Sequence, residues 1–127
     1  MTGKALVLIV DDEAFHRYTT RMMLQQAGFD VKEAATGQDG LRLAEEHPDV
    51  VLLDLHLPDM SGAEVCRRLK QTPSTAAIRV VHVTAAYLGS AERREALEAG
   101  SDGYLMRPID APQLLATIKA VLARRAA

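Results

Sequence analysis

Residues 49–60, DVVLLDLHLPDM, carry the strongest structural signal in the chain. The apolar run from Val50 to Leu53 suits a strand that is buried on both faces, as strands in a parallel sheet are. Asp54 ends this run, although a buried carboxylate costs several kcal/mol unless a partner compensates its charge. The stretch therefore predicts a central strand over residues 50–54 whose last side chain has a polar role.

Strand-like and helix-like segments alternate on both sides of this stretch. Strands are predicted at 5–10, 30–34, 50–54, 79–84 and 102–106, and helices at 14–27, 37–46, 62–71, 90–99 and from Asp110 onward. Strands that are separated by helices pair in parallel through right-handed crossovers, with helices on both faces of the sheet. We therefore expect a single α/β domain of five strand–helix units over residues 1–127.

The apolar positions of the helices predict their inner faces. Phe15, Tyr18 and Met22 share one face of the first helix, and the third helix directs Val65, Cys66 and Leu69 inward. Gly28 and Gly100 are typical of helix ends. The last helix, with Asp110 as its cap, is expected to bury one stripe made of Leu114, Leu115, Ile118, Val121 and Leu122.

Composition limits the classes of function. The chain has 127 residues, 48% of them apolar, which is enough for one domain with a substantial core. A net charge of −2 gives no electrostatic reason to expect nucleic acid or an anionic membrane as the main partner. There is no signal peptide or membrane-length apolar segment, and the single Cys66 suits a reducing compartment as a core residue. We expect a soluble cytoplasmic domain.

Polar residues gather at the predicted strand ends. Asp11 and Asp12 follow the first strand, Asp54 and Thr84 close the third and fourth, and Arg107 follows the fifth. The carboxyl ends of parallel strands lie at one edge of the sheet, so these side chains should meet there. Three clustered carboxylates repel one another unless a hard cation binds them, which favours Mg²⁺ or Mn²⁺ over Zn²⁺.

Four motifs in this order resemble one protein family. LVLIVDDE, LLDLHLPDMSG, HVTA and AGSDGYLMRPID are similar to the conserved segments of the receiver domain of two-component response regulators. The resemblance covers residues 4–124. It implies a single (βα)5 flavodoxin-like domain, with a five-stranded parallel sheet of order 2-1-3-4-5 and helices on both faces.

The resemblance also implies a role for each residue of the acidic cluster. Asp54 would accept a phosphoryl group from a phosphohistidine on a sensor histidine kinase or a phosphotransfer protein. Asp12, Asp54 and the backbone carbonyl of His56 would bind Mg²⁺ directly, and Asp11 would act through a bound water. The product is a phosphoprotein that signals, so we expect a signalling module and not an enzyme.

The resemblance implies a switch at the neighbouring strand ends. The Thr84 hydroxyl and the Ala85 N–H would donate to phosphoryl oxygens, with Arg107 as the nearby cation. Tyr104 would then turn from exposed to buried. This remodels the face made by the fourth helix, fifth strand and fifth helix, which would bind an unknown downstream partner. The domain itself would contact neither nucleic acid nor a membrane.

Three other functions compete with this interpretation. A phosphatase of the haloacid dehalogenase type needs a second Asp two residues after its nucleophile, where this chain has His56. A flavodoxin-like FMN binder needs phosphate-binding donors after the first strand, where this chain has Asp-Asp-Glu. The third is a pseudo-receiver, an interaction module that works without phosphorylation, because Arg107 stands where the family usually has Lys.

The remaining polar residues are given ordinary structural roles. His82 is expected to be a core histidine with satisfied hydrogen bonds, the His56 ring to be exposed, and the charged stretch at 92–98 to be a solvated helix face. The chain ends soon after its last helix. It is therefore either a single-domain regulator or a receiver from a longer protein, and its C-terminal part resembles receivers of hybrid sensor kinases.

Overall fold

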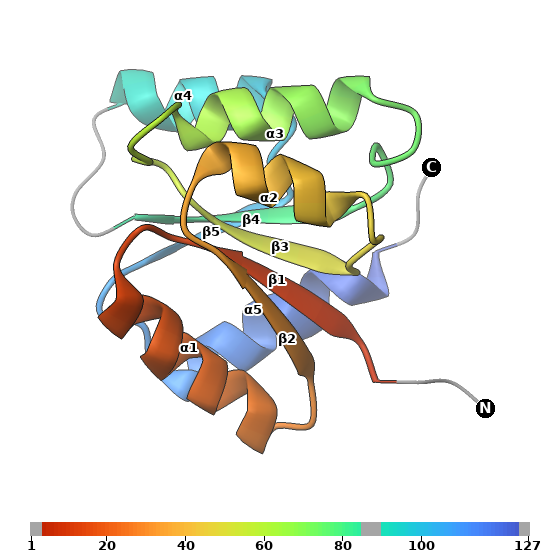
Figure 1. Cartoon of the computed structure of the whole chain (residues 1–127). Coiled ribbons are helices and arrows are strands. Elements are labelled where there is room, and N and C mark those ends of the chain that lie inside the picture. Colours follow the sequence, from red (N-terminus) through yellow and green to blue (C-terminus); the bar gives the residue numbers. More distant parts are fainter. Residues whose placement is uncertain (1–3, 85–89, 125–127) are drawn as a thin grey trace.

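In the part of the chain that the structure describes, five strands and five helices alternate, as the sequence predicts. The computed structural model describes residues 4–84 and 90–124. All strands are parallel, in the order β2-β1-β3-β4-β5, which confirms the predicted (βα)5 fold (Figure 1). The elements are β1 Leu6–Val10, α1 Ala14–Gln26, β2 Asp30–Ala34, α2 Gly37–Ala44, β3 Val50–Asp54, α3 Gly62–Gln71, β4 Arg79–Thr84, α4 Ser90–Glu98, β5 Gly103–Met106 and α5 Ala111–Ala123.

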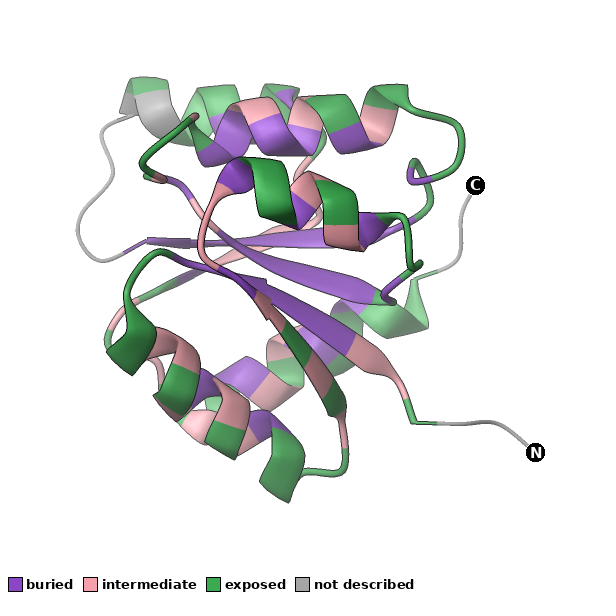
Figure 2. Cartoon of the chain, viewed as in Figure 1, coloured by how far each residue is buried: buried purple, intermediate pink, exposed green. Residues whose placement is uncertain are grey.

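The helices cover both faces of the sheet. Helices α2, α3 and α4 lie on one face and α1 and α5 on the other (Figure 1). The three central strands β1, β3 and β4 are therefore buried on both sides (Figure 2), which is why they read as continuous apolar runs. The edge strand β2 alternates between exposed and more buried residues instead. The polar residues that end the central strands are thus held on a rigid frame.

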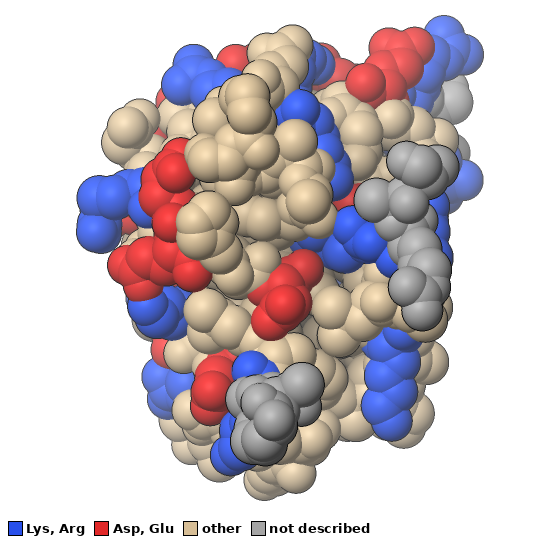
Figure 3. Space-filling view, turned by 90° about the vertical axis from the view of Figure 1, so that its right-hand side faces the viewer, with Lys and Arg blue, Asp and Glu red and all other residues tan. Residues whose placement is uncertain are grey.

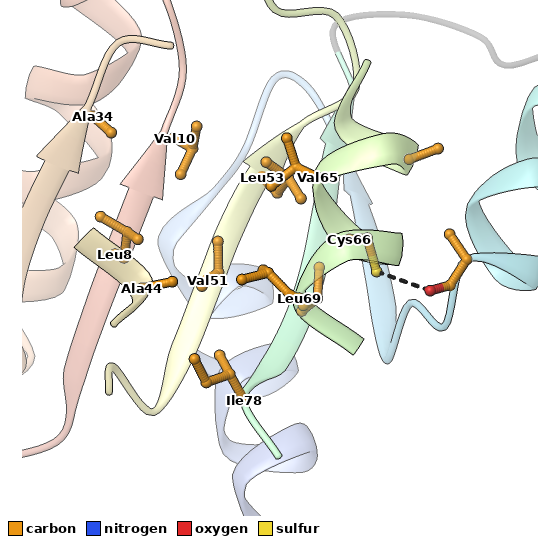
Figure 4. Packing of buried hydrophobic residues seen from close by; sticks show 13 residues of the cluster. Leu8, Val10, Ala34, Ala44, Val51, Leu53, Val65, Cys66, Leu69 and Ile78 are labelled. Atoms are coloured by element: carbon orange, nitrogen blue, oxygen red, sulfur yellow. Dashed lines mark hydrogen bonds between the residues drawn. The ribbon is translucent and has the colours of Figure 1, made fainter. Parts of the chain in front are cut away.

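Each face of the sheet has its own apolar core. On the α2–α3 face, Val65, Cys66 and Leu69 of α3 pack on Leu8, Val51 and other strand residues (Figure 4). The Cys66 thiol donates to the carbonyl of Ala99 at 3.4 Å, and burial raises its pKa to about 11. A thiol with this pKa is a poor nucleophile at neutral pH, so the prediction of a structural cysteine is confirmed.

The second core contains α1 and α5 and corrects two predictions. Leu114, Ile118 and Val121 are buried as expected, and Leu115 is partly buried. The prediction that Leu122 belongs to the buried stripe is wrong, because its side chain lies at the rim of the core and is 37% exposed. In α1 the residues packed inward are Thr20 and Leu24, so the shared face of Phe15, Tyr18 and Met22 is exposed, with Phe15 at 72%.

Local signals explain the helix ends. Asp110 caps α5 through a hydrogen bond of 2.7 Å from the Gln113 N–H to Oδ1. Gly28 and Gly100 follow α1 and α4 with φ of +94° and +101°, a left-handed conformation that favours glycine. The observed elements differ from the predicted ranges by one or two residues at several ends, such as α2, which ends at Ala44.

The edge at which the strands begin carries charges of both signs. Figure 3 shows this edge, with acidic and basic residues interspersed over it. Lys32 binds Glu46 there, and Asp49 accepts a hydrogen bond of 2.8 Å from the Leu6 N–H. Opposite charges that lie side by side largely cancel. The clustered carboxylates described next lie at the other edge of the sheet.

Candidate functional site

The carboxyl ends of β1 and β3 bring three acids together. Asp11 and Asp12 directly follow β1, and Asp54 is the last residue of β3. Each offers a carboxylate oxygen, and these oxygens lie within 4.8 Å of one another. β1 and β3 are neighbours in the sheet, so the parallel pairing itself produces the cluster. The convergence predicted from the sequence is therefore present.

Asp11 is the most enclosed of the three acids. Its side chain is 2% exposed, and its Oδ1 accepts a hydrogen bond of 2.9 Å from the Glu13 N–H. Its Oδ2 accepts a hydrogen bond from Arg107 and lies 3.6 Å from Nδ1 of His16. Both oxygens of Asp11 are thus engaged by protein groups, whereas Asp12 is exposed at the mouth of the site.

Arg107 enters the site from the segment that follows β5. Its backbone N–H donates to the carbonyl of Thr84 at 2.7 Å, which continues the pairing of β4 with β5. Its guanidinium is 13% exposed and forms an ion pair with Asp11 across the sheet edge. The predicted cation therefore lies inside the pocket, and its direct partner is the most buried acid.

Asp54 has an unfavourable environment for its charge. Burial raises its pKa above the ordinary value, and the negative charges of Asp11 and Asp12 act in the same direction. The His56 N–H, 3.2 Å from Oδ1, and the charge of Arg107 offset this only in part. The single positive charge of Arg107 therefore does not balance the three carboxylates.

The chemistry of the donors fits a hard divalent cation. The three clustered ligand groups are all carboxylates, which Mg²⁺ and Mn²⁺ prefer and which are unusual as a complete set for Zn²⁺. A bound cation would relieve the repulsion from Asp11 and Asp12 that adds to burial in raising the pKa of Asp54. The residues present therefore fit the metal that the sequence predicts.

The predicted switch residues lie on the next two strands of the sheet, β4 and β5. Thr84 is buried at the end of β4, one residue after Val83, which pairs with Asp54. Tyr104 of β5 is partly buried against Leu55 and Ala96. Ala85, the other expected phosphoryl donor, lies outside the described residues.

The structure agrees with the prediction for His56 and agrees only in part with the prediction for His82. The His56 ring is exposed as expected. His82 is fully buried, as predicted, but neither ring nitrogen forms a hydrogen bond of normal geometry with residues 4–84 and 90–124, and the Gly62 backbone is at most a weak partner. Burial lowers the pKa of His82, with partial opposition from the nearby Gly62 backbone. Burial in the core therefore disfavours the charged form of the His82 ring.

Three side chains near the site were missed by sequence analysis. His16 of α1 approaches Asp11, and Asp59 of the β3–α3 loop binds the start of α2. Arg93 of α4 donates to the Tyr104 hydroxyl, with its guanidinium carbon 5.1 Å from the ring centre. The stretch at 92–98 is therefore not only a solvated face. Each contact depends on how two different elements meet in space, so the sequence pattern of one element could not reveal it.

Comparison with known proteins identifies the same kind of domain. The sequence profile of the family described as "Response regulator receiver domain" matches residues 7–119. The chain is 38% identical over 119 residues to the phosphate regulon transcriptional regulatory protein PhoB of Rhizobium meliloti, covering 93% of this chain and 52% of PhoB. It is 39% identical over 120 residues to protein PilH of Pseudomonas aeruginosa, covering 94% of this chain and 98% of PilH.

A solved structure agrees with the sequence matches. A putative response regulator from Chloroflexus aurantiacus superposes with a TM-score of 0.89 at 30% identity, covering 95% of this chain and 99% of that one. The chain thus spans about half the length of relatives such as PhoB and nearly all of PilH. Within residues 4–84 and 90–124, none of the helices has both the length and the apolar character needed to cross a bilayer.

Proposed function

The chain belongs to the response regulator receiver domain family, and we propose that Asp54 is its phosphoacceptor in two-component signalling. The observation that carries this proposal is the convergence of Asp54 with Asp11 and Asp12, whose ligand oxygens lie within 4.8 Å of one another. The phosphoryl donor is a phosphohistidine on a sensor histidine kinase or a phosphotransfer protein. The kinase uses ATP, so the transfer takes place in the cytoplasm.

The transfer itself requires little more than a positioned carboxylate. An Asp54 oxygen attacks the phosphorus, a new O–P bond forms, and the N–P bond of the phosphohistidine breaks. The electron pair of that bond remains on the imidazole of the donor, so no further reactant is needed. The hydrogen bond from His56 N–H to Asp54 Oδ1 orients the carboxylate and leaves its other oxygen for the attack.

Metal binding accompanies this role. Asp12, Asp54 and the His56 carbonyl would bind Mg²⁺ or Mn²⁺ directly, and Asp11 through water, since both of its oxygens already have protein partners. When bound, the cation supplies the positive charge that the carboxylates and the incoming phosphoryl oxygens require.

Arg107 supplies a second positive charge. Its ion pair with Asp11 keeps the guanidinium inside the pocket, where it can neutralise a phosphoryl oxygen as the usual Lys does. This favours a phosphorylated receiver over the pseudo-receiver alternative. The planar guanidinium has directional donors, and we expect it to couple phosphorylation to Tyr104 more weakly than Lys would.

The phosphodonor has a natural docking surface beside the acids. An open groove of about 430 Å³ lies between α1 and the segment that joins β5 to α5, lined by Phe15, His16, Met23, Arg107 and Ile109 among others. It is mostly apolar, and Arg107 connects it directly to the acidic cluster. The exposed face of α1 extends it. Exposed apolar patches of this kind mark sites of protein interaction, and a donor seated here is next to Asp54.

The output is a change at the α4–β5–α5 face. Phosphate bound by Thr84 and the Ala85 N–H would draw Thr84 inward, and Tyr104 would then become fully buried. Helix α4 and strand β5 each expose a large apolar side chain, Leu97 and Met106 respectively, which suits a protein partner. We propose that residues 1–127 form one receiver domain that itself contacts neither nucleic acid nor a membrane.

Beryllofluoride, an analogue of the phosphoryl group, tests this function. With Mg²⁺ present, amide signals of residues 79–84 and 103–107 of the wild type are expected to shift, and those of Asp54→Asn are not. Arg107→Lys should bind the analogue too, with larger shifts near Tyr104. A folded wild type that shows no shifts would favour the pseudo-receiver.

Removal of the Arg93 side chain is expected to free Tyr104. Arg93 covers the Tyr104 ring and donates to its hydroxyl, so Arg93→Ala should cost about 0.5–1 kcal/mol of stability. The ring signals of Tyr104 should move toward those of an exposed tyrosine. Arg94→Ala, which changes the adjacent exposed arginine, is the control and should leave them unchanged. Identical Tyr104 signals in both variants would show that Arg93 does not hold the ring.

A further inference from the structure

The β3–α3 loop, residues 55–61, is closed tightly beside Asp54. The Gly62 N–H donates to the Leu55 carbonyl at 2.8 Å, and His56 and Ser61 pair across the loop as an isolated antiparallel bridge. A side chain at Gly62 would place its Cβ 2.2 Å from the Asp54 carbonyl oxygen, which only glycine avoids. The loop conformation and the position of the Asp54 carboxylate are therefore linked.

The tip of the same loop is fixed to a different element. The Asp59 carboxylate accepts one hydrogen bond of 2.8 Å from the Gly37 N–H and another of 2.9 Å from the Gln38 N–H, at the start of α2. The hydroxyl of Thr36, the N-cap of α2, accepts a hydrogen bond of 3.0 Å from the next N–H of the helix, that of Asp39. The first N–H groups of α2 thus bind a residue more than twenty positions away.

The contact is electrostatic and steric at once. The two N–H donors hold the pKa of Asp59 below its ordinary value, so the side chain is charged at neutral pH, as suits a helix N-terminus. Gly37 is buried, and a Cβ there would lie 2.6 Å from Cγ of Met60. Adjacent loop residues therefore touch the start of α2 by two independent contacts.

We infer that Asp59 is a positioning residue for the phosphoacceptor site, which fixes the 55–61 loop to α2 so that the His56 backbone stays directed at Asp54 and the metal. This inference rests on the proposed function of Asp54. Asp59 touches neither Asp54 nor a metal ligand, and acts only through the loop. A plain helix cap would stabilise α2 without affecting the site.

The affinity for Mg²⁺ separates the two roles. Groups that orient metal ligands typically change metal affinity by 10–100-fold when mutated. Asp59→Ala is therefore expected to weaken Mg²⁺ binding on the order of ten-fold, measured by titration of the folded protein, and to shift the His56 amide signal. Asp59→Asn keeps one acceptor oxygen and should recover part of the affinity. Both variants remove the same charge, so their difference reports the hydrogen bonds.

Asp39→Asn is the matched control. It removes a negative charge from the first turn of the same helix, where Asp39 is exposed. The N–H groups of Gly37 and Gln38 bind Asp59 and not Asp39, so this variant leaves the link to the loop intact. Its Mg²⁺ affinity should equal that of the wild type. Wild-type affinity in Asp59→Ala, with only a lower melting temperature, would overturn the inference and leave Asp59 as a cap. A wild type that binds neither Mg²⁺ nor beryllofluoride would instead overturn the proposed function.

Discussion

Mg²⁺ is expected to raise the melting temperature of the wild type, and Asp12→Asn is expected to lose most of that gain. Without metal, the oxygens of Asp11, Asp12 and Asp54 repel one another at distances within 4.8 Å. A ligand that binds only the native state contributes about 2.7 kcal/mol at a hundred-fold excess over its Kd. For a chain of this size the shift is on the order of 10 °C, and calorimetry with Mg²⁺ or a chelator measures it.

The control for this prediction is Asp30→Asn. Asp30 is an exposed acid at the start of β2, at the opposite edge of the sheet, so this variant loses a negative charge without touching the cluster. It should retain the full Mg²⁺ effect, whereas the metal-free Asp12→Asn protein should be as stable as the wild type or more so. A wild type whose melting temperature ignores millimolar Mg²⁺ would refute the metal site.

The second large effect is expected from Arg107→Ala. The Asp11 carboxylate is 2% exposed and Arg107 is the cation that binds it, so removing the guanidinium leaves a buried charge without its ion-pair partner. Breaking a buried ion pair in this way costs about 3 kcal/mol or more. Mg²⁺ should restore much of the loss, because the metal compensates the same acids. Denaturant unfolding with and without Mg²⁺ gives both values.

Arg42→Ala is the matched control for Arg107. Arg42 lies 3.6 Å from Asp39 in an ion pair whose side chains are 67% and 51% exposed, so its removal should change stability by at most about 0.5 kcal/mol. An equal loss for Arg107→Ala with and without Mg²⁺ would mean that Arg107 acts by packing. No loss at all would mean that the ion pair does not stabilise the fold.

The parts of the fold that the sequence predicts well follow from short-range rules. Strand segments of four to six residues alternate with helical segments, and this alternation predicts a parallel sheet. The sheet then brings Asp11 and Asp54 together although they are far apart in the chain. The strand order came from family resemblance, since composition and periodicity do not fix it.

Other features depend on contacts that periodicity does not encode. The spacing of Phe15, Tyr18 and Met22 shows that they share a face, but the packing of α1 through Thr20 and Leu24 decides that this face is exposed. Likewise, the hydrogen bonds of Asp59 to α2 and of Arg93 to Tyr104 depend on how loops, helices and strands meet. Such contacts appear only once the elements are placed in three dimensions.

Phosphorylation of Asp54 is the central claim, and intact mass spectrometry after incubation with acetyl phosphate tests it most directly. With Mg²⁺ the wild type should gain the mass of one phosphoryl group, and with a chelator it should gain none. Asp54→Asn should remain unmodified under both conditions, although its fold is kept. Incorporation that persists in Asp54→Asn, or a folded wild type that takes up no phosphoryl group with Mg²⁺, would contradict the assignment.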